Sequence, residues 1–303
     1  MNGQQPLSSC PVSVVILTLN EELNLPQCLA SVSGWVCQIF VVDAGSSDKT
    51  RGIANEFGAI VVEHPFETHS KQWRWALDNL PIRTDWVLAL DADQRVTPEL
   101  AREISELSWQ LTDTDGFYIK RRQWFRGRWI KWGGYYPKYL LKMFRRDAVA
   151  TDPADLVDHH FYVAGPTRKL RHDLDEANQK EDDISFWIEK HNRYATLLAR
   201  EEIVWRNGAP STAIEPSMTG TPDQRSLAFR RLWRRMPLYV RPLLYFSYRY
   251  FVRLGILDGK QGLSSISCRR SGSACSSTSR LMSYFRRTIR HVRREFAQEH
   301  RWL

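Results

Sequence analysis

The stretch VVILTLNEELNLPQCLASVSGWVCQIFVVDAGSSDKTRGIANEFGAIVV, residues 14–62, decides the fold. Short β-branched runs alternate in it with helical patterns, which predicts strands at 14–17, 39–42 and 60–62 and helices at 22–33 and 48–57. A βαβαβ order of this kind predicts a parallel sheet with helices on both faces.

The alternation of strand and helix patterns continues to about residue 107. Residues 71–79 form another helical pattern, and residues 86–90 form a buried strand that runs straight into Asp91. Thr97 and Pro98 supply an N-cap and a first-turn proline for a helix through residue 107.

Composition changes along the chain and predicts three parts. Residues 1–206 form the α/β domain, with a nucleotide-binding half at 12–115 and an aromatic, basic acceptor-facing half at 116–206. A Gly/Pro/Ser/Thr-rich linker spans 207–223, and a basic, aromatic, helical tail spans 224–303.

Charge and cysteine usage limit the partners and the compartment. The 303 residues carry a formal net charge of +9, with a pI near 9.4, so we expect anionic partners. The 5 cysteines show no CxxC spacing, and residues 1–10 lack a secretory signal. We therefore expect a reduced, cytoplasmic protein.

The tail predicts contact with a membrane surface. No apolar run is long enough to span a bilayer, because arginines interrupt residues 238–257. Aromatic rings alternate with arginines over residues 232–257, so such helices can place rings at headgroup level and guanidinium groups on lipid phosphates. Packing of these helices on the catalytic domain is the alternative.

Two carboxylates follow the buried strand at 86–90, in the order Leu88-Ala89-Leu90-Asp91-Ala92-Asp93. Ligands bind at the carboxyl edge of an open α/β sheet. Hard oxygen ligands at that edge suit Mg²⁺ or Mn²⁺, which complete their shells with water and substrate phosphates. An Asp-x-Asp alone is also compatible with a turn or a helix cap.

Other strands bring polar residues to the same edge. The strand at 39–42 ends at Asp43, where a carboxylate can bind a ribose or a base. Ser46 in the following turn is a further candidate for binding the same ligand. The first strand ends with Thr18, Asn20 and Glu22. We expect these side chains to line one crevice.

The combined pattern resembles the family 2 glycosyltransferases of the GT-A fold. The motifs that carry the resemblance are Thr18 to Glu22, Val42 to Thr50 and Asp91 to Asp93, together with the helix at 71–77 and the turn at 133–137. The resemblance implies a mixed sheet flanked by helices, here with a C-terminal helical, basic and aromatic extension. The resemblance covers roughly residues 12–202, and residues 254–260 also match the family pattern.

The resemblance also implies roles for individual residues. Asp43 would hold the nucleoside, Asp93 would bind the metal with Asp91 beside it, and Lys71 would neutralise the diphosphate. The general base would come from the segment at 154–160, with Asp158 as first choice.

The chain departs from the family pattern at several positions. His159 stands where Glu is usual and is itself a candidate base, as is Asp155. Trp73, Arg74 and Gln94 also depart from the pattern.

The activity that the resemblance implies is an inverting, metal-dependent transfer from a nucleotide sugar, such as a UDP-sugar. The acceptor would be a lipid-linked, lipopolysaccharide or other envelope glycan at the inner face of the cytoplasmic membrane. A metal-dependent nucleotidyltransferase and a basic nucleic-acid-binding protein are the alternatives. A nucleotidyltransferase would normally carry a Gly-rich phosphate loop after the first strand, and no RRM, KH or helix-turn-helix signature is present, so we expect no nucleic acid partner.

Overall fold

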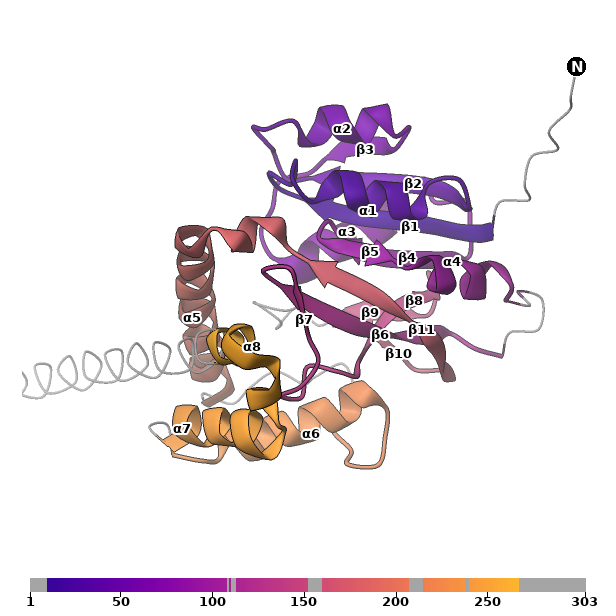
Figure 1. Cartoon of the computed structure of the whole chain (residues 1–303). Helices are drawn as coiled ribbons and strands as arrows, with labels where there is room; N and C mark the ends of the chain where they lie inside the picture. The colour runs from indigo at the N-terminus through magenta and orange to yellow at the C-terminus, as the bar shows by residue number, and fades with distance from the viewer. Residues whose placement is uncertain are drawn as a thin grey trace, which may run out of the picture.

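The computed structural model describes residues 10–107, 109, 113–151, 160–206, 215–237 and 240–266, without the side chains of residues 204, 205, 265 and 266. A large mixed sheet forms the centre of the molecule, with helices on both faces (Figure 1). The later helices gather at one end of it.

The central sheet has the strand order β3-β2-β1-β4-β8-β6-β11-β5, and β7 pairs with β6. Its strands are β1 (Cys10–Thr18), β2 (Val36–Asp43), β3 (Ile60–Glu63), β4 (Trp86–Asp91), β5 (Gln94–Val96), β6 (Gly116–Phe125), β7 (Arg128–Ile130), β8 (Lys138–Arg145) and β11 (Thr167–Ala177). Strands β3, β2, β1 and β4 run parallel, and β8 is antiparallel to both β4 and β6. The carboxyl ends of β1, β2 and β4 therefore meet at one edge.

Apolar side chains on alternate positions of β1 and β4 pack into two cores. On one face Val14 and Ile16 pack with α1 (Leu25–Val32), α2 (Thr50–Glu56) and α4 (Pro98–Ser105). On the other face Val15 packs with α3 (His69–Asn79) and with the hairpin of β9 (Val149–Thr151) and β10 (Phe161–Val163). Strands buried on both faces read as continuous apolar runs, which is why residues 14–17 and 86–90 were recognisable in the sequence.

Helices also follow the last strand of the sheet. They are η2 (Gln179–Asp182), α5 (Ile184–Arg206), α6 (Pro222–Arg234), α7 (Val240–Ser247), η3 (Tyr248–Val252), η4 (Gly255–Asp258) and α8 (Gly259–Ile266). A small third core joins them to the sheet, with Phe125 and Ile130 packing against Trp187, Phe246 and Tyr250. Within the described ranges, none of the helices has the length and apolarity that crossing a bilayer requires.

The α/β elements expected from the sequence are present, and their ends differ by a few residues. The helix expected at 22–33 begins only at Leu25, because residues 20–24 form the loop that follows β1. The helix expected at 98–107 ends at Ser105, and Thr97 caps it as predicted by accepting a hydrogen bond from the Leu100 N–H. The expected linker at 207–223 is described only from residue 215, and α6 already begins at Pro222.

Candidate functional site

The loop after β2 is organised around the buried carboxylate of Asp43. Its Oδ2 accepts the N–H groups of Gly45 (3.1 Å) and Ser46 (2.8 Å), and its Oδ1 accepts the hydroxyls of Thr18 (3.0 Å) and Ser46. The Asp43 side chain is fully buried. Thr18 and Ser46 are thus brought together by the residue that the sequence singled out for nucleoside binding.

The loop after β1 lies against this turn. The Asn20 N–H donates to Ser46 Oγ (2.8 Å), and Asn20 Oδ1 accepts the Ser47 N–H (2.8 Å). The Glu22 N–H donates to Asp48, whose other oxygen accepts from the N–H and hydroxyl of Thr50 at the start of α2. Asn20 adopts a φ of 54°, a left-handed conformation that asparagine tolerates well. The sequence candidates Thr18, Asn20, Glu22, Asp43 and Ser46 therefore form one continuous edge of hydrogen-bonded loops.

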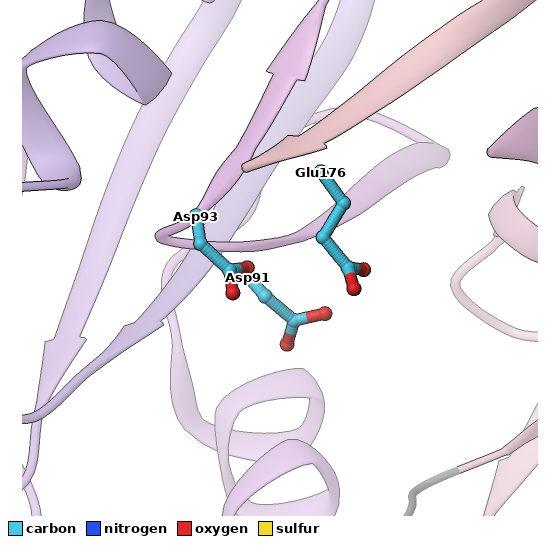
Figure 2. A group of neighbouring side chains, drawn as sticks. All are labelled: Asp91, Asp93 and Glu176. Carbon is cyan, nitrogen blue, oxygen red and sulfur yellow. The ribbon is translucent and has the colours of Figure 1, made fainter. Parts of the chain in front are cut away.

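A cluster of acidic side chains lies at the end of β4. Carboxylate oxygens of Asp91, Asp93 and Glu176 all lie within 4.8 Å of one another (Figure 2). Glu176 comes from the end of β11, which pairs with β5 directly after the Asp-x-Asp. Three hard oxygen donors at this spacing suit the coordination of Mg²⁺ or Mn²⁺, so the side chains present fit the predicted metal.

Cationic and amide groups surround the acidic cluster. Lys142 Nζ lies 3.0 Å from Asp91 Oδ2, and Arg121 Nη1 lies 2.8 Å from Glu176 Oε2. The Asn178 amide donates to Asp93 Oδ2 at 3.1 Å. Burial and the charge of Glu176 raise the pKa of Asp93 to about 8, so mutual repulsion among these carboxylates is only partly balanced by nearby cations.

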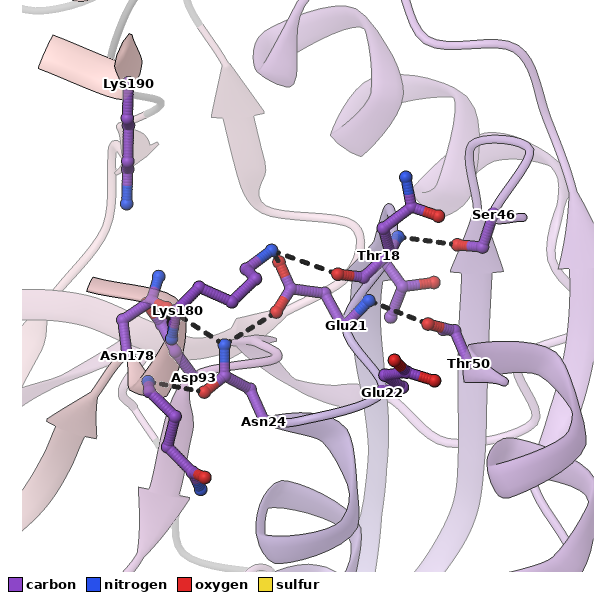
Figure 3. Close-up of polar contacts among 12 residues, drawn as sticks. Thr18, Glu21, Glu22, Asn24, Ser46, Thr50, Asp93, Asn178, Lys180 and Lys190 are labelled. Carbon is purple, nitrogen blue, oxygen red and sulfur yellow. Dashed lines mark hydrogen bonds and ion pairs between the residues drawn. The ribbon is translucent and has the colours of Figure 1, made fainter. Parts of the chain in front are cut away.

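Lys190 of α5 extends toward the same region (Figure 3). It pairs with Glu181 at 2.9 Å. Burial alone would lower the pKa of Lys190, but the neighbouring groups Tyr194, Glu181 and Asp93 raise it above the usual lysine range. Lys190 is therefore a permanent positive charge beside the acidic cluster.

A polar network joins the loop after β1 to the end of β11 (Figure 3). The Asn24 amide donates to Glu21 (2.8 Å) and to Asn178 Oδ1 (3.1 Å), while Asn24 Oδ1 accepts the Gln179 N–H (2.8 Å). Lys180 pairs with Glu21 and donates to the Asn20 carbonyl. Residues 178–180 therefore contact the loop after β1 and, through Asn178, also Asp93 of the acidic cluster.

The remaining candidates are Lys71 and the three possible bases. Lys71, expected at the diphosphate, is exposed on the first turn of α3 and pairs with Glu67. The candidate bases Asp158, His159 and Asp155 lie outside the described residues. Their roles stay predictions.

The C-terminal helices hold the glycine-rich turn at 133–137. The Gly133 N–H donates to the Arg253 carbonyl (2.8 Å), and the Arg249 guanidinium donates to the Gly133 carbonyl. Asp258 of η4 accepts the N–H groups of Lys131 (3.2 Å) and Trp132 (2.8 Å). The basic aromatic segment thus packs against the turn at 133–137 through these hydrogen bonds.

Comparison with known families agrees with this geometry. A family model described as glycosyl transferase family 2 matches residues 13–175, which is more than half of the chain. The chain belongs to glycosyl transferase family 2. The matched region begins in β1 and ends in β11, so it contains Asp91 and Asp93 and stops one residue before Glu176.

Several bacterial relatives with curated names are glycosyltransferases. An uncharacterized glycosyltransferase of Rickettsia felis is 36% identical over 93 residues, which cover 31% of this chain and 32% of that protein. The chain therefore spans about a third of the length of such relatives. The lipopolysaccharide core biosynthesis glycosyltransferase LpsC of Rhizobium meliloti is 25% identical over 208 residues, covering 64% of this chain and 72% of LpsC.

A solved structure shares the fold of this family 2 glycosyltransferase. The mannosyltransferase PcManGT from Pyrobaculum calidifontis, solved with GDP-Man and Mn²⁺, has a TM-score of 0.50 and 13% identity, with coverage of 91% of this chain and 88% of that one. The fold is GT-A, as the sequence predicted: a mixed sheet flanked by helices.

The sequence alone did not indicate Glu176, Lys142, Asn178 or Lys190. Residues 172–177 of β11 are mostly polar or charged, so their sequence does not show the alternation typical of a half-buried strand. Two leucines four residues apart, Leu170 and Leu174, are its only buried apolar anchors, and a register shift between them obscures the strand period. That weak spacing was the one available signal.

Proposed function

We propose that this family 2 glycosyltransferase transfers a sugar, with inversion, from a nucleotide sugar to a lipid-linked, lipopolysaccharide or other envelope glycan, and that the transfer depends on Mg²⁺ or Mn²⁺. We name the loops after β1 and β2, which contain Asn20, Glu22 and Ser46, the donor-side loops. The observation that carries the proposal is the convergence of Asp91, Asp93 and Glu176 at the same edge of the sheet. PcManGT, which shares the fold, was solved with a nucleotide sugar and Mn²⁺, and LpsC acts in lipopolysaccharide core biosynthesis, which supports the choice of donor and acceptor class.

The metal would be held by Asp93, with Asp91 and Glu176 completing the protein ligands. When bound, a divalent ion neutralises charge that develops on a departing diphosphate. The loops around Asp43 would position the nucleoside, and Lys190 adds positive charge close to Asp93.

The reaction is a single displacement at the anomeric carbon. Asp158, the first choice for the base, takes the proton of the acceptor hydroxyl. The acceptor oxygen forms the new bond to the anomeric carbon as the bond from that carbon to the diphosphate oxygen breaks, and its electron pair leaves with the nucleoside diphosphate. Attack opposite the leaving group inverts the configuration.

The test is a screen of UDP-, GDP- and other nucleotide sugars with Mn²⁺ or Mg²⁺, in which release of nucleoside diphosphate is followed with and without bacterial membrane extract. We expect extract-dependent release that Asp93→Ala abolishes, while the variant keeps a cooperative thermal transition. Release of pyrophosphate from a nucleoside triphosphate would instead indicate a nucleotidyltransferase. Unchanged turnover by the Asp93→Ala variant would refute the metal role.

We further propose that α6, α7 and η3–η4 rest on an anionic membrane surface. Large apolar side chains are exposed on these helices, including Leu243 (67%), Phe251 (58%), Val252 (69%) and Leu257 (53%). Exposed arginines, such as Arg253, lie among them. Rings and aliphatic side chains beside guanidinium groups suit the headgroup region of an anionic leaflet.

Vesicle co-sedimentation of the full chain tests this surface. Binding to phosphatidylglycerol vesicles should exceed binding to phosphatidylcholine vesicles. It should fall at least about tenfold in the Phe251→Ser/Val252→Ser variant, because two apolar side chains that would enter the bilayer are lost. Ile188→Ser, which removes an exposed apolar side chain of α5, is the matched control and should bind normally. Equal binding by all three proteins would contradict the surface.

A further inference from the structure

Lys142 is a buried lysine beside Asp91 of the acidic cluster. It lies in β8 and is only 4% exposed. The pairing of β6 with β8 passes from Phe117 opposite Met143 to Tyr118 opposite Leu141, so Lys142 is the extra residue of a β-bulge. A bulge redirects a side chain out of the regular pleat and is common beside active sites. Here it delivers Nζ to Asp91.

A lysine buried in this way needs an anionic partner, because an unpaired ammonium is costly to remove from water. Asp91 is that partner, at 3.0 Å. Arg121 likewise accompanies Glu176 at 2.8 Å. Lys142 and Arg121 thus offset part of the negative charge of Asp91 and Glu176.

A divalent ion and Lys142 would share one carboxylate. A Mg²⁺ or Mn²⁺ ion binds a carboxylate oxygen at about 2.1 Å, so an ion on Asp91 Oδ2 would lie no more than about 5 Å from Nζ. Two cations at that separation repel each other, and both compete for the same negative charge. The ion, together with the cations already paired with the cluster, would favour an anion in its coordination shell.

We propose that Lys142 is the counter-ion of Asp91 in the metal-free protein, and that on metal binding its ammonium transfers to the diphosphate of the nucleotide. The inference rests on the proposed function and assigns to Lys142 the charge neutralisation that the sequence had assigned to Lys71. Lys142 would reach a diphosphate held by an ion on Asp91, because Nζ already lies 3.0 Å from Asp91 Oδ2. Lys142 is thereby a binding residue for donor and leaving group.

Removal of the Lys142 charge has two opposite consequences. Lys142→Met keeps the length of the side chain and removes the competitor, so Mn²⁺ affinity should rise. The affinity of the Mn²⁺-loaded protein for nucleoside diphosphate should fall. Each change should be at least about tenfold, because a unit charge this close to its partner is poorly screened. A purely structural lysine would not move the two affinities in opposite directions.

The experiment uses the full chain and isothermal titration. Mn²⁺ is titrated alone, and then whichever of UDP and GDP binds the wild type is titrated at saturating Mn²⁺. Lys169→Met removes an exposed lysine near the opposite end of β11 and should leave both affinities unchanged. Lys142→Arg should restore nucleotide binding toward the wild-type value, and Lys142→Gln replaces the Met variant if that variant does not fold.

A measurement on the wild type covers the case in which no Lys142 variant folds. Lys142 should react faster with an amine-modifying reagent once Mn²⁺ is added, and slower again when nucleoside diphosphate follows, as read by peptide mass spectrometry. Weaker Mn²⁺ binding by Lys142→Met, unchanged nucleotide binding, or no change in labelling would overturn the assignment. Failure of the wild type to bind Mn²⁺ at all would instead overturn the proposed function on which the assignment rests.

Discussion

Replacement of Asp43 tests whether its carboxylate organises the donor-side loops. The side chain is fully buried and accepts hydrogen bonds from Thr18, Gly45 and Ser46. Asp43→Ala leaves these donors without their acceptor. Asp43→Asn keeps one carbonyl oxygen for the two N–H groups, and its NH₂ group can donate to the two hydroxyls, which are able to accept.

The magnitude follows from which donors lose their partner. Gly45 is exposed, so water can replace the lost acceptor, and the Thr18 hydroxyl can turn to the Val42 carbonyl at 3.4 Å. The N–H of Ser46, which is only 3% exposed, has no comparable substitute. Each hydrogen bond to a charged group contributes about 1.5–3 kcal/mol, so Asp43→Ala should lose about 3 kcal/mol of unfolding free energy and Asp43→Asn about 1 kcal/mol.

Urea unfolding followed by fluorescence and circular dichroism measures both values. The midpoint should fall much further for Asp43→Ala than for Asp43→Asn, with an unchanged slope. Nucleotide affinity should drop in the Ala variant even where it remains folded, because Ser46 and Asn20 lose their common support. Equal stability of wild type and Asp43→Ala would refute the organising role.

Three further predictions concern side chains outside the donor-side loops. Glu176→Gln should weaken Mn²⁺ binding at least about tenfold by titration, because the ion loses a carboxylate ligand; unaltered affinity would remove Glu176 from the ligand set. Burial raises the pKa of Asp223 above its ordinary 3.8, so the stability that its neutral form provides is fully present below that value and is lost as pH rises through the folded-state pKa. The urea midpoint of Asp223→Asn, relative to that of the wild type, should therefore rise from about pH 4 to about pH 8. A midpoint difference that does not change with pH would contradict this. Asp258→Ala should cost about 1–2 kcal/mol of unfolding free energy and speed hydrogen exchange at Lys131 and Trp132, whose N–H groups it accepts; protection as in the wild type would show that the turn needs no such anchor.

The first half of the fold, from β1 to α4, was predictable because its central strands are buried on both faces. Continuous apolar runs such as residues 86–90 have few other interpretations between helical patterns. Helix ends were less certain. Residues 22–24 fit a helical pattern, but the N–H groups of Asn24 and Leu25 both bond to the Glu21 carbonyl in the turn that precedes α1.

The half of the fold from β6 to α5 was harder to predict because charge pairs join β6 to β11. Arg122 binds Asp175 through two contacts, at 2.6 and 3.0 Å, and Lys120 lies 3.6 Å from Asp173. Opposite charges that face each other over residues 120–122 and 173–175 support the pairing where neither strand has an apolar period. A sequence pattern based on hydrophobicity cannot find such strands.

The site was predictable as far as it lies at strand ends of the first half. Asp91 and Asp93 follow a buried strand, so their convergence with the β1 and β2 loops follows from parallel topology. Glu176 joins them through the pairing of β5 with β11, and Lys142 through a bulge. Both depend on register, which the sequence does not display.

The network around Asn178 explains why donor and metal binding should be coupled in this enzyme. Asn178 donates to Asp93 and accepts from Asn24, and Asn24 also contacts Glu21 in the donor-side loop. A shift of Asp93 toward a bound ion would therefore move Asn178 and, through it, the loop that lies against Ser46. Because Glu176 completes the acidic cluster and Asn178 supports the loop after β1, the proposed site needs residues from both ends of the sheet's strand sequence.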